Sequence, residues 1–184
     1  MVKTKLEIDA AIYIVIAFAL MLLPFEWVVG WVVATWVHEV SHYIALRAFR
    51  VTVFKIRIGL HGARMEIEPI PPKCEILCAA AGPIGGMLLI LLGKWAPVSM
   101  FCGIIQSTYN LLPVHPMDGG RILSTLLEWK LGVYRGQIIM RWVSICTICC
   151  IAAVSAYLWI GLEKGIFALV LPLLFVLKSL RKKS

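Results

Sequence analysis

The stretch that decides the fold is Trp27–Ala48, WVVGWVVATWVHEVSHYIALRA, one of the most apolar parts of the chain, with the pattern HExxH at residues 38–42. On a helix, His38 and His42 lie one turn apart on the same face, so both imidazoles can bind one metal ion. Glu39 lies beside them, where it can accept a proton from a metal-activated water molecule. Ionisable side chains at membrane depth are costly unless a metal, a partner or water compensates them. The pattern therefore favours a metal site over a chance match or a helix with mutually satisfied histidines.

The composition is that of a membrane protein. Apolar residues make up 61% of the 184 residues and the mean hydropathy is +0.90, whereas soluble domains contain about 45–50% apolar residues. A net charge of +8 would suit a nucleic-acid partner in a soluble protein, but here Lys and Arg lie in short segments between apolar runs. No basic surface module with interleaved aromatic residues is present, so we expect no nucleic-acid partner. The length predicts one integral-membrane domain over residues 1–184.

Six hydrophobic segments reach or approach the roughly 20 residues that a helix needs to cross a bilayer. The predicted fold is therefore an all-α polytopic membrane protein of about six transmembrane helices. Lys3, Lys5 and the following apolar run resemble a signal peptide, but no small-x-small cleavage site follows, so we expect a retained first helix. The segments are Ile8–Pro24, Glu26–Ala48, Glu75–Gly93, Val98–Trp129 (interrupted), Gln137–Ile160 and Gly165–Leu177.

The segment Val51–Pro69 has a different pattern, in which β-branched and apolar residues alternate around His61-Gly62. This pattern predicts a small membrane-associated β-hairpin or edge strand between the second and third spans, although a plain interfacial loop fits it equally well. Bare backbone edges are not tolerated in lipid, so such strands must lie at the interface or in a protein-lined cavity. A sheet edge beside a metal site suits a substrate held in extended form by strand addition.

A third protein ligand is expected, because a catalytic zinc ion usually has three protein ligands and a water molecule. Asp118 lies in the sequence NLLPVHPMDGGR at 110–121, where two prolines and two glycines break the fourth hydrophobic segment. A carboxylate at a broken helix suits a metal ligand, and the alternative is a helix-capping Asp118 paired with Arg121. His61 and His115 are weaker candidates, with more local roles on the strand turn and as a lining or hydrogen-bonding group.

Three motifs in combination resemble the site-2 protease family of intramembrane zinc metalloproteases: HEVSH at 38–42, AAAGPIGG at 79–86 and NLLPVHPMDGGRIL at 110–123. The resemblance covers about residues 26–127, the expected catalytic core. The chain is similar to the short sporulation factor IVFB group, without a PDZ or CBS domain. Two positions depart from the family's pattern, with Gly86 where Asn is common and His61-Gly62 where Gly-Gly is common. Both affect the expected substrate preference rather than the chemistry. We expect the glycines of the second motif to permit close helix approach.

The resemblance implies a zinc ion bound by His38, His42 and Asp118, with Glu39 as the catalytic acid/base. It also implies that Asn110 and the region of Pro113 position the substrate backbone. The implied reaction is hydrolysis of peptide bonds in or near transmembrane segments, that is, regulated intramembrane proteolysis. The implied setting is the lipid bilayer of a bacterial cell membrane. The implied substrates are anti-sigma factors, membrane-tethered transcription-factor precursors or signal-peptide remnants.

Two other classes of protein stay open: a catalytically inactive membrane binding module and a metal transporter whose HExxH conducts ions. A transporter is disfavoured because the sequence contains no inverted repeat and no second polar span that would continue an ion pathway. An inactive module is disfavoured because the expected ligands and the base are all present.

The distribution of Lys and Arg predicts the orientation in the membrane. Positive charge precedes segment one and follows segments two, four and six, whereas the turns on the opposite side carry only Lys94 and Lys164. The positive-inside rule therefore places both termini and the connection 47–73 in the cytoplasm. Reporter fusions after residue 184 and in the turn at Lys94 should report opposite compartments. The same compartment from both fusions would contradict the six-span topology.

Overall fold

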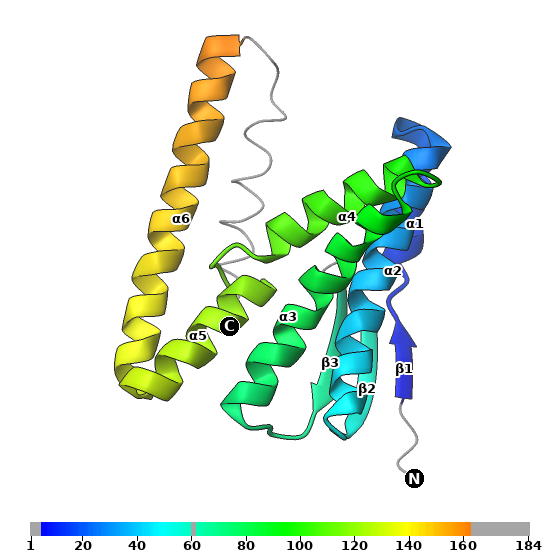
Figure 1. Ribbon diagram of the computed structural model, residues 1–184. Helices are drawn as coiled ribbons and strands as arrows, with labels where there is room; N and C mark the ends of the chain where they lie inside the picture. Colours follow the sequence, from blue (N-terminus) through cyan, green and yellow to red (C-terminus); the bar gives the residue numbers. More distant parts are fainter. Residues whose placement is uncertain (1–4, 60–61, 163–184) are drawn as a thin grey trace. The chain divides into compact units, whose positions relative to one another are not determined.

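The computed structural model describes residues 5–59 and 62–162 (Figure 1). The described residues form six α-helices, a short 3-10 helix and one three-stranded sheet. The chain divides into two compact units, Met1–Asn110 and Leu111–Ser184. The division falls inside the interrupted fourth segment that the sequence predicted, because the helix there ends at Asn110.

In the first unit, α2 packs against α3 and α4, and α3 also packs against α4. Prolines mark the helix starts: Pro24 directly precedes α2, while Pro72 and Pro97 open α3 and α4. Proline suits this position because the first turn of a helix needs no N–H donor and its φ is already helical. The helices are α1 (Ala11–Leu22), α2 (Phe25–Ala48), α3 (Pro72–Leu88), the 3-10 helix η1 (Leu89–Leu92) and α4 (Pro97–Asn110).

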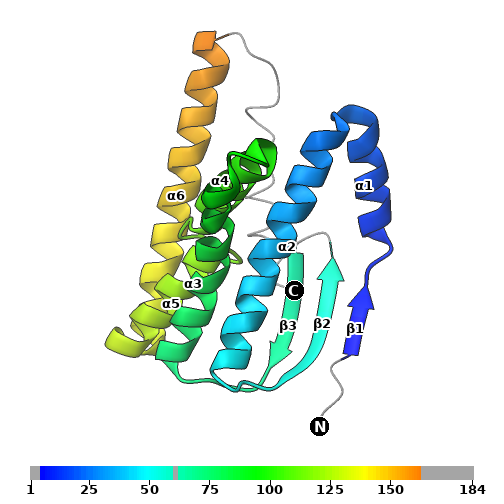
Figure 2. The same cartoon turned by 45° about the vertical axis from the view of Figure 1, so that its right-hand side comes forward.

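The sheet has the strand order β1-β2-β3, and in Figure 2 the three strands lie next to one another in this order (β1 Lys5–Ile8, β2 Val53–Gly59, β3 Gly62–Ile67). β2 and β3 form an antiparallel hairpin in which Ile56 faces Met65, so the predicted hairpin is confirmed in place of a plain loop. The parallel strand β1 was not predicted. Its Glu7 forms ion pairs with two residues of β2, Lys55 at 2.8 Å and Arg57 at 3.4 Å.

β1 corrects one expectation about the hairpin. With β1 on one side and β3 on the other, β2 is the central strand, so its backbone offers no free edge for strand addition. Among the described strands, the outer edges of the sheet are those of β1 and β3, and β3 packs beside α2. An edge-strand role therefore falls to Gly62–Ile67 and not to residues 56–59.

A small hydrophobic core holds the sheet against the helices of the first unit. The buried residues come from the end of α2, the start of the hairpin and α3, and side chains of both β2 and β3 pack on them. This packing places the sheet beside the C-terminal half of α2, the half that carries HExxH. The core consists of Leu46, Val51, Val53 and Cys78, flanked by Tyr43, Ala45, Ile56, Met65, Ile67 and Ile70.

The described part of the second unit consists of α5 (Asp118–Leu131), α6 (Val133–Leu162) and the loop 111–117 that precedes them. Gly132 joins the two helices with φ of +81°, a conformation that favours glycine. Gly136 then lets α6 approach α5 closely, because a Cβ atom there would meet the backbone of Glu128. In the loop, Val114 and Met117 are buried.

Among the described residues, two helices are long and apolar enough to cross a membrane, Pro72–Leu92 and Val133–Tyr157, and Ile12–Leu22 is apolar but shorter. In Val133–Tyr157, only 6% of the most apolar stretch is buried, whereas the core helix of a soluble protein is mostly buried. These exposed apolar helices support association with a membrane. The helices α4 and α5 have 14 residues each, about 21 Å, and neither alone spans a core of about 30 Å. The predicted segment Gly165–Leu177 lies outside the described residues, so the count of six spans stays a prediction.

Candidate metal centre

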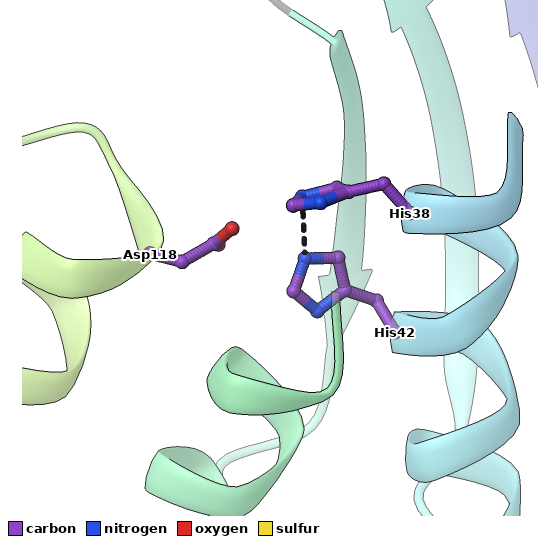
Figure 3. Close-up of side chains that lie close together, drawn as sticks. All are labelled: His38, His42 and Asp118. Atoms are coloured by element: carbon purple, nitrogen blue, oxygen red, sulfur yellow. Dashed lines mark hydrogen bonds between the residues drawn. The ribbon is translucent and has the colours of Figure 1, made fainter. Parts of the chain in front are cut away.

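The two histidines of HExxH lie on one face of α2, as the spacing predicted (Figure 3). His38 is 4% exposed, and the ring centroids of the two histidines are 4.8 Å apart with the rings nearly perpendicular. Their Nε2 atoms are 3.2 Å apart. Two Zn–N bonds of about 2.0–2.1 Å at a tetrahedral angle would place the two nitrogen atoms about 3.3 Å apart. The pair therefore fits two corners of a tetrahedral zinc site.

A backbone carbonyl fixes the orientation of His42. Nδ1 of His42 lies 2.7 Å from the carbonyl oxygen of Cys78 on α3. A carbonyl can only accept, so Nδ1 carries the hydrogen and donates it, which leaves the lone pair of the neutral ring on Nε2. A metal-binding histidine typically uses its second nitrogen in this way, which sets the tautomer and raises the basicity of the ligand.

Glycines of α3 make room for the face of α2 that carries the histidines. A Cβ atom at Gly82 would overlap the His42 imidazole, and one at Gly85 would overlap the hydroxyl of Ser41. The prediction that these glycines permit close helix approach is confirmed. Pro83 follows within the same helix and is buried. It has no N–H, so it interrupts the regular hydrogen bonds of α3 beside the contact with His42.

The helices α2 and α4 pack against each other in the first unit. Trp27 and Phe101 form an edge-to-face pair, and Thr35 donates a hydrogen bond of 3.4 Å to Gln106. Glu39 lies in the C-terminal half of α2, and Asn110 is the last residue of α4. Both residues are half-buried.

The break in the fourth segment is confirmed, since α4 ends at Asn110 and α5 begins at Asp118. Met117 occupies the N-cap position, and Asp118 is the first helical residue. Its carboxylate therefore lies at the positive end of the helix dipole. Pro113 lies in the loop between the two helices, and its carbonyl accepts a hydrogen bond from Ser144 on α6, 3.3 Å long.

Among the described residues, His38, His42 and Asp118 form a group of possible metal ligands. One donor atom from each lies within 4.8 Å of the others, and Figure 3 shows these three side chains. Two imidazoles and a carboxylate are a donor set found in catalytic zinc sites. His115 is not part of this group. The other candidate, His61, lies outside the described residues.

Comparisons with known proteins agree with the motifs. No family model matches the chain. A zinc metalloprotease of Methanocaldococcus jannaschii is 28% identical to it over 109 residues, which cover 52% of this chain and 32% of that protein. The structure of the site-2 protease from the same organism matches 97% of this chain and 90% of its own, with a TM-score of 0.67 and 20% identity. The chain has the fold of a site-2 protease.

The resemblance to the site-2 protease family that the three motifs predicted is thus confirmed. The aligned part spans about a third of the length of the zinc metalloprotease, so activity and substrates are matters for proposal. Sequence reasoning did not identify the acceptor for His42, because a backbone carbonyl leaves no signal in side-chain identity.

The contact of Gly82 with His42 generates a test. In Gly82→Ala, the added methyl group displaces the imidazole from the Cys78 carbonyl, so zinc affinity should fall by at least tenfold, as for other disrupted supports of metal ligands. Chelator competition on the purified protein measures this. Gly59→Ala is the control, because no atom lies within 4 Å of the added Cβ. Equal zinc affinity in both variants would contradict the support of His42 by α3.

Proposed function

We propose that the protein is a membrane-embedded zinc metalloprotease that hydrolyses peptide bonds in or near transmembrane segments. The observation that carries the proposal is the 3.2 Å distance between the Nε2 atoms of His38 and His42. The hydrogen bond from Nδ1 of His42 to the Cys78 carbonyl fixes the orientation of one of the two rings. The fold of a site-2 protease and the similarity to a zinc metalloprotease support it. So does the group of His38, His42 and Asp118, which offers zinc three protein ligands.

Each residue of the site has a role in this proposal. His38, His42 and Asp118 would hold the zinc ion, which when bound would supply the Lewis acidity that lowers the pKa of water far below its ordinary value and polarises a carbonyl. The carboxylate of Glu39 takes the proton from the attacking water and returns it to the leaving amine. Glu39 is half-buried, so its carboxylate works in surroundings drier than bulk water, where charge interactions are stronger.

The substrate chain is held by backbone contacts on two sides. The carboxamide of Asn110, at the end of α4, is the proposed polar contact, together with the region of Pro113. The free edge of β3 is the proposed partner for an extended substrate segment, because β3 contacts α2 and one of its edges is unpaired in the sheet. A helical substrate must unwind to pair in this way, so helix-breaking residues near the cleavage point favour it.

The proposed substrates are membrane proteins of the classes that the resemblance implies, such as anti-sigma factors, tethered transcription-factor precursors and signal-peptide remnants. The exposed apolar surfaces of α1 and α6 support a site reached from the bilayer. In this proposal both termini face the cytoplasm of a bacterial cell, and HExxH lies toward the cytoplasmic end of α2. Water reaches the site from that side.

The decisive test removes the base and keeps the ligands. Glu39→Gln should lower cleavage of a membrane reporter substrate by about 10²–10⁴-fold, the usual contribution of a general acid/base, while about one zinc per chain stays bound. The reporter is a single-span protein with a helix-breaking Gly-Pro pair in its span. Glu26→Gln, at the other end of the same helix, is the matched control. Cleavage by Glu39→Gln at the wild-type rate would rule out the proposed base, and wild-type protein that binds zinc without cleavage would favour a binding module.

A second test addresses strand addition. Successive backbone amides of a strand point to opposite edges, so of Met65 and Glu66 on β3 one donates toward β2 and the other toward the free edge. Proline at the outward position removes a donor from the substrate and should raise the KM several-fold while the zinc content stays constant. Proline at the inward position breaks the hairpin and serves as the comparison. Unchanged KM in both variants would exclude β3 as the docking strand.

A further inference from the structure

The loop 111–117 contains backbone groups that no helix or strand satisfies. Within it, the Val114 amide donates to the Leu112 carbonyl at 2.8 Å, and the Met117 amide donates to the Val114 carbonyl at 2.9 Å. Pro113 and Pro116 have no amide hydrogen at all. In an apolar environment each free carbonyl costs free energy unless a donor is supplied. The donor for the Pro113 carbonyl is the hydroxyl of Ser144 on α6.

Ser144 uses its hydroxyl differently from its neighbour on the same helix. Thr147 donates to the Val143 carbonyl of its own helix, 2.8 Å away, which is the common arrangement for a hydroxyl in an apolar helix. Ser144 instead donates outward to the loop. Met140, one turn earlier on α6, is 3% exposed, so this face of the helix is packed and Ser144 is half-buried.

The loop in turn lies directly on the first turn of α5. A Cβ atom at Gly119 would overlap the Leu111 carbonyl, and one at Gly120 would meet the Val114 carbonyl at 2.5 Å. These two glycines directly follow Asp118, so a shift of the loop also shifts the backbone that carries the Asp118 carboxylate. Within the second unit, Ser144 therefore contacts the loop 111–117, and the loop contacts the helical turn that carries Asp118.

We infer that Ser144 is a positioning residue: its hydroxyl holds the Pro113 carbonyl and thereby fixes the loop 111–117 and the carboxylate of Asp118. This inference rests on the proposed role of Asp118 as a zinc ligand. Loss of the hydroxyl leaves the carbonyl without a donor, so the loop moves to satisfy it, and Asp118 moves with the loop. Zinc affinity and turnover then fall together, although Ser144 contacts neither zinc nor substrate.

The test compares hydroxyl variants of α6 in the full-length purified protein. Ser144→Ala removes the donor and little volume, Ser144→Val also has no donor, and Ser144→Thr has nearly the size and shape of the Val variant but keeps the hydroxyl. The apparent zinc dissociation constant, from chelator competition, should rise about tenfold in the first two variants and return close to the wild-type value in the third. Thr147→Val is the matched control and should leave zinc affinity unchanged, because its hydroxyl serves only its own helix.

Cleavage of the single-span reporter gives the second readout, with kcat expected to fall more than KM rises. Wild-type zinc affinity in both Ser144→Ala and Ser144→Val would overturn the inference. So would an equal loss in Thr147→Val, which would indicate general loosening of α6, or a failure of Ser144→Thr to rescue. If zinc affinity depends on Ser144 as described but the wild-type protein cleaves nothing, the positioning role stands and the protease proposal fails.

Discussion

The hydrogen bond from Nδ1 of His42 to the Cys78 carbonyl is the constraint on which the rest of the first unit depends. A backbone acceptor can reach the imidazole only if α3 lies against α2, and that approach requires Gly82 in place of any residue with a side chain. The same approach buries Cys78 together with Leu46 in the core that holds the hairpin. The orientation of the His42 ring, the packing of α3 against α2 and the position of the hairpin therefore depend on one another.

In an apolar environment, backbone groups outside helices need hydrogen-bond partners within the protein, and the loop 111–117 and the sheet obtain them in different ways. Chain breaks in a lipid-exposed helix leave carbonyls and amides that must be satisfied by protein. The loop 111–117 meets this requirement with two internal hydrogen bonds and the Ser144 hydroxyl. The central strand of the sheet meets it differently, because β1 and β3 pair with its two sides and Glu7 forms ion pairs with Lys55 and Arg57. Among the described residues, the loop and the central strand are thus both completed by other parts of the chain, whereas the outer edge of β3 stays open.

The sequence predicted most of the helices and the residues of the candidate site, because both depend on local patterns. HExxH fixes two imidazoles through helical periodicity, and the two prolines and two glycines around Asp118 predict a helix break wherever the segment lies. β1 could not be predicted, since four residues, KLEI, carry no periodicity and their pairing partner is about fifty residues away. In the sequence, Lys5 and Lys55 count only as positive charges that predict the membrane orientation. The ion pairs of Glu7 form only once β1 and β2 are paired, so the sequence did not reveal them. The acceptor for His42 and the role of Ser144 also depend on tertiary contacts.

The parallel pairing of β1 with β2 has a consequence for biosynthesis. Lys5 pairs opposite Lys55, and both α1 and α2 lie between them in the chain. Parallel neighbouring strands cannot be joined by a tight turn. β1 therefore cannot pair with β2 until both helices have been made and the chain has returned to the position of β1. Completion of the sheet therefore depends on prior synthesis of both preceding helices, including the helix that carries HExxH.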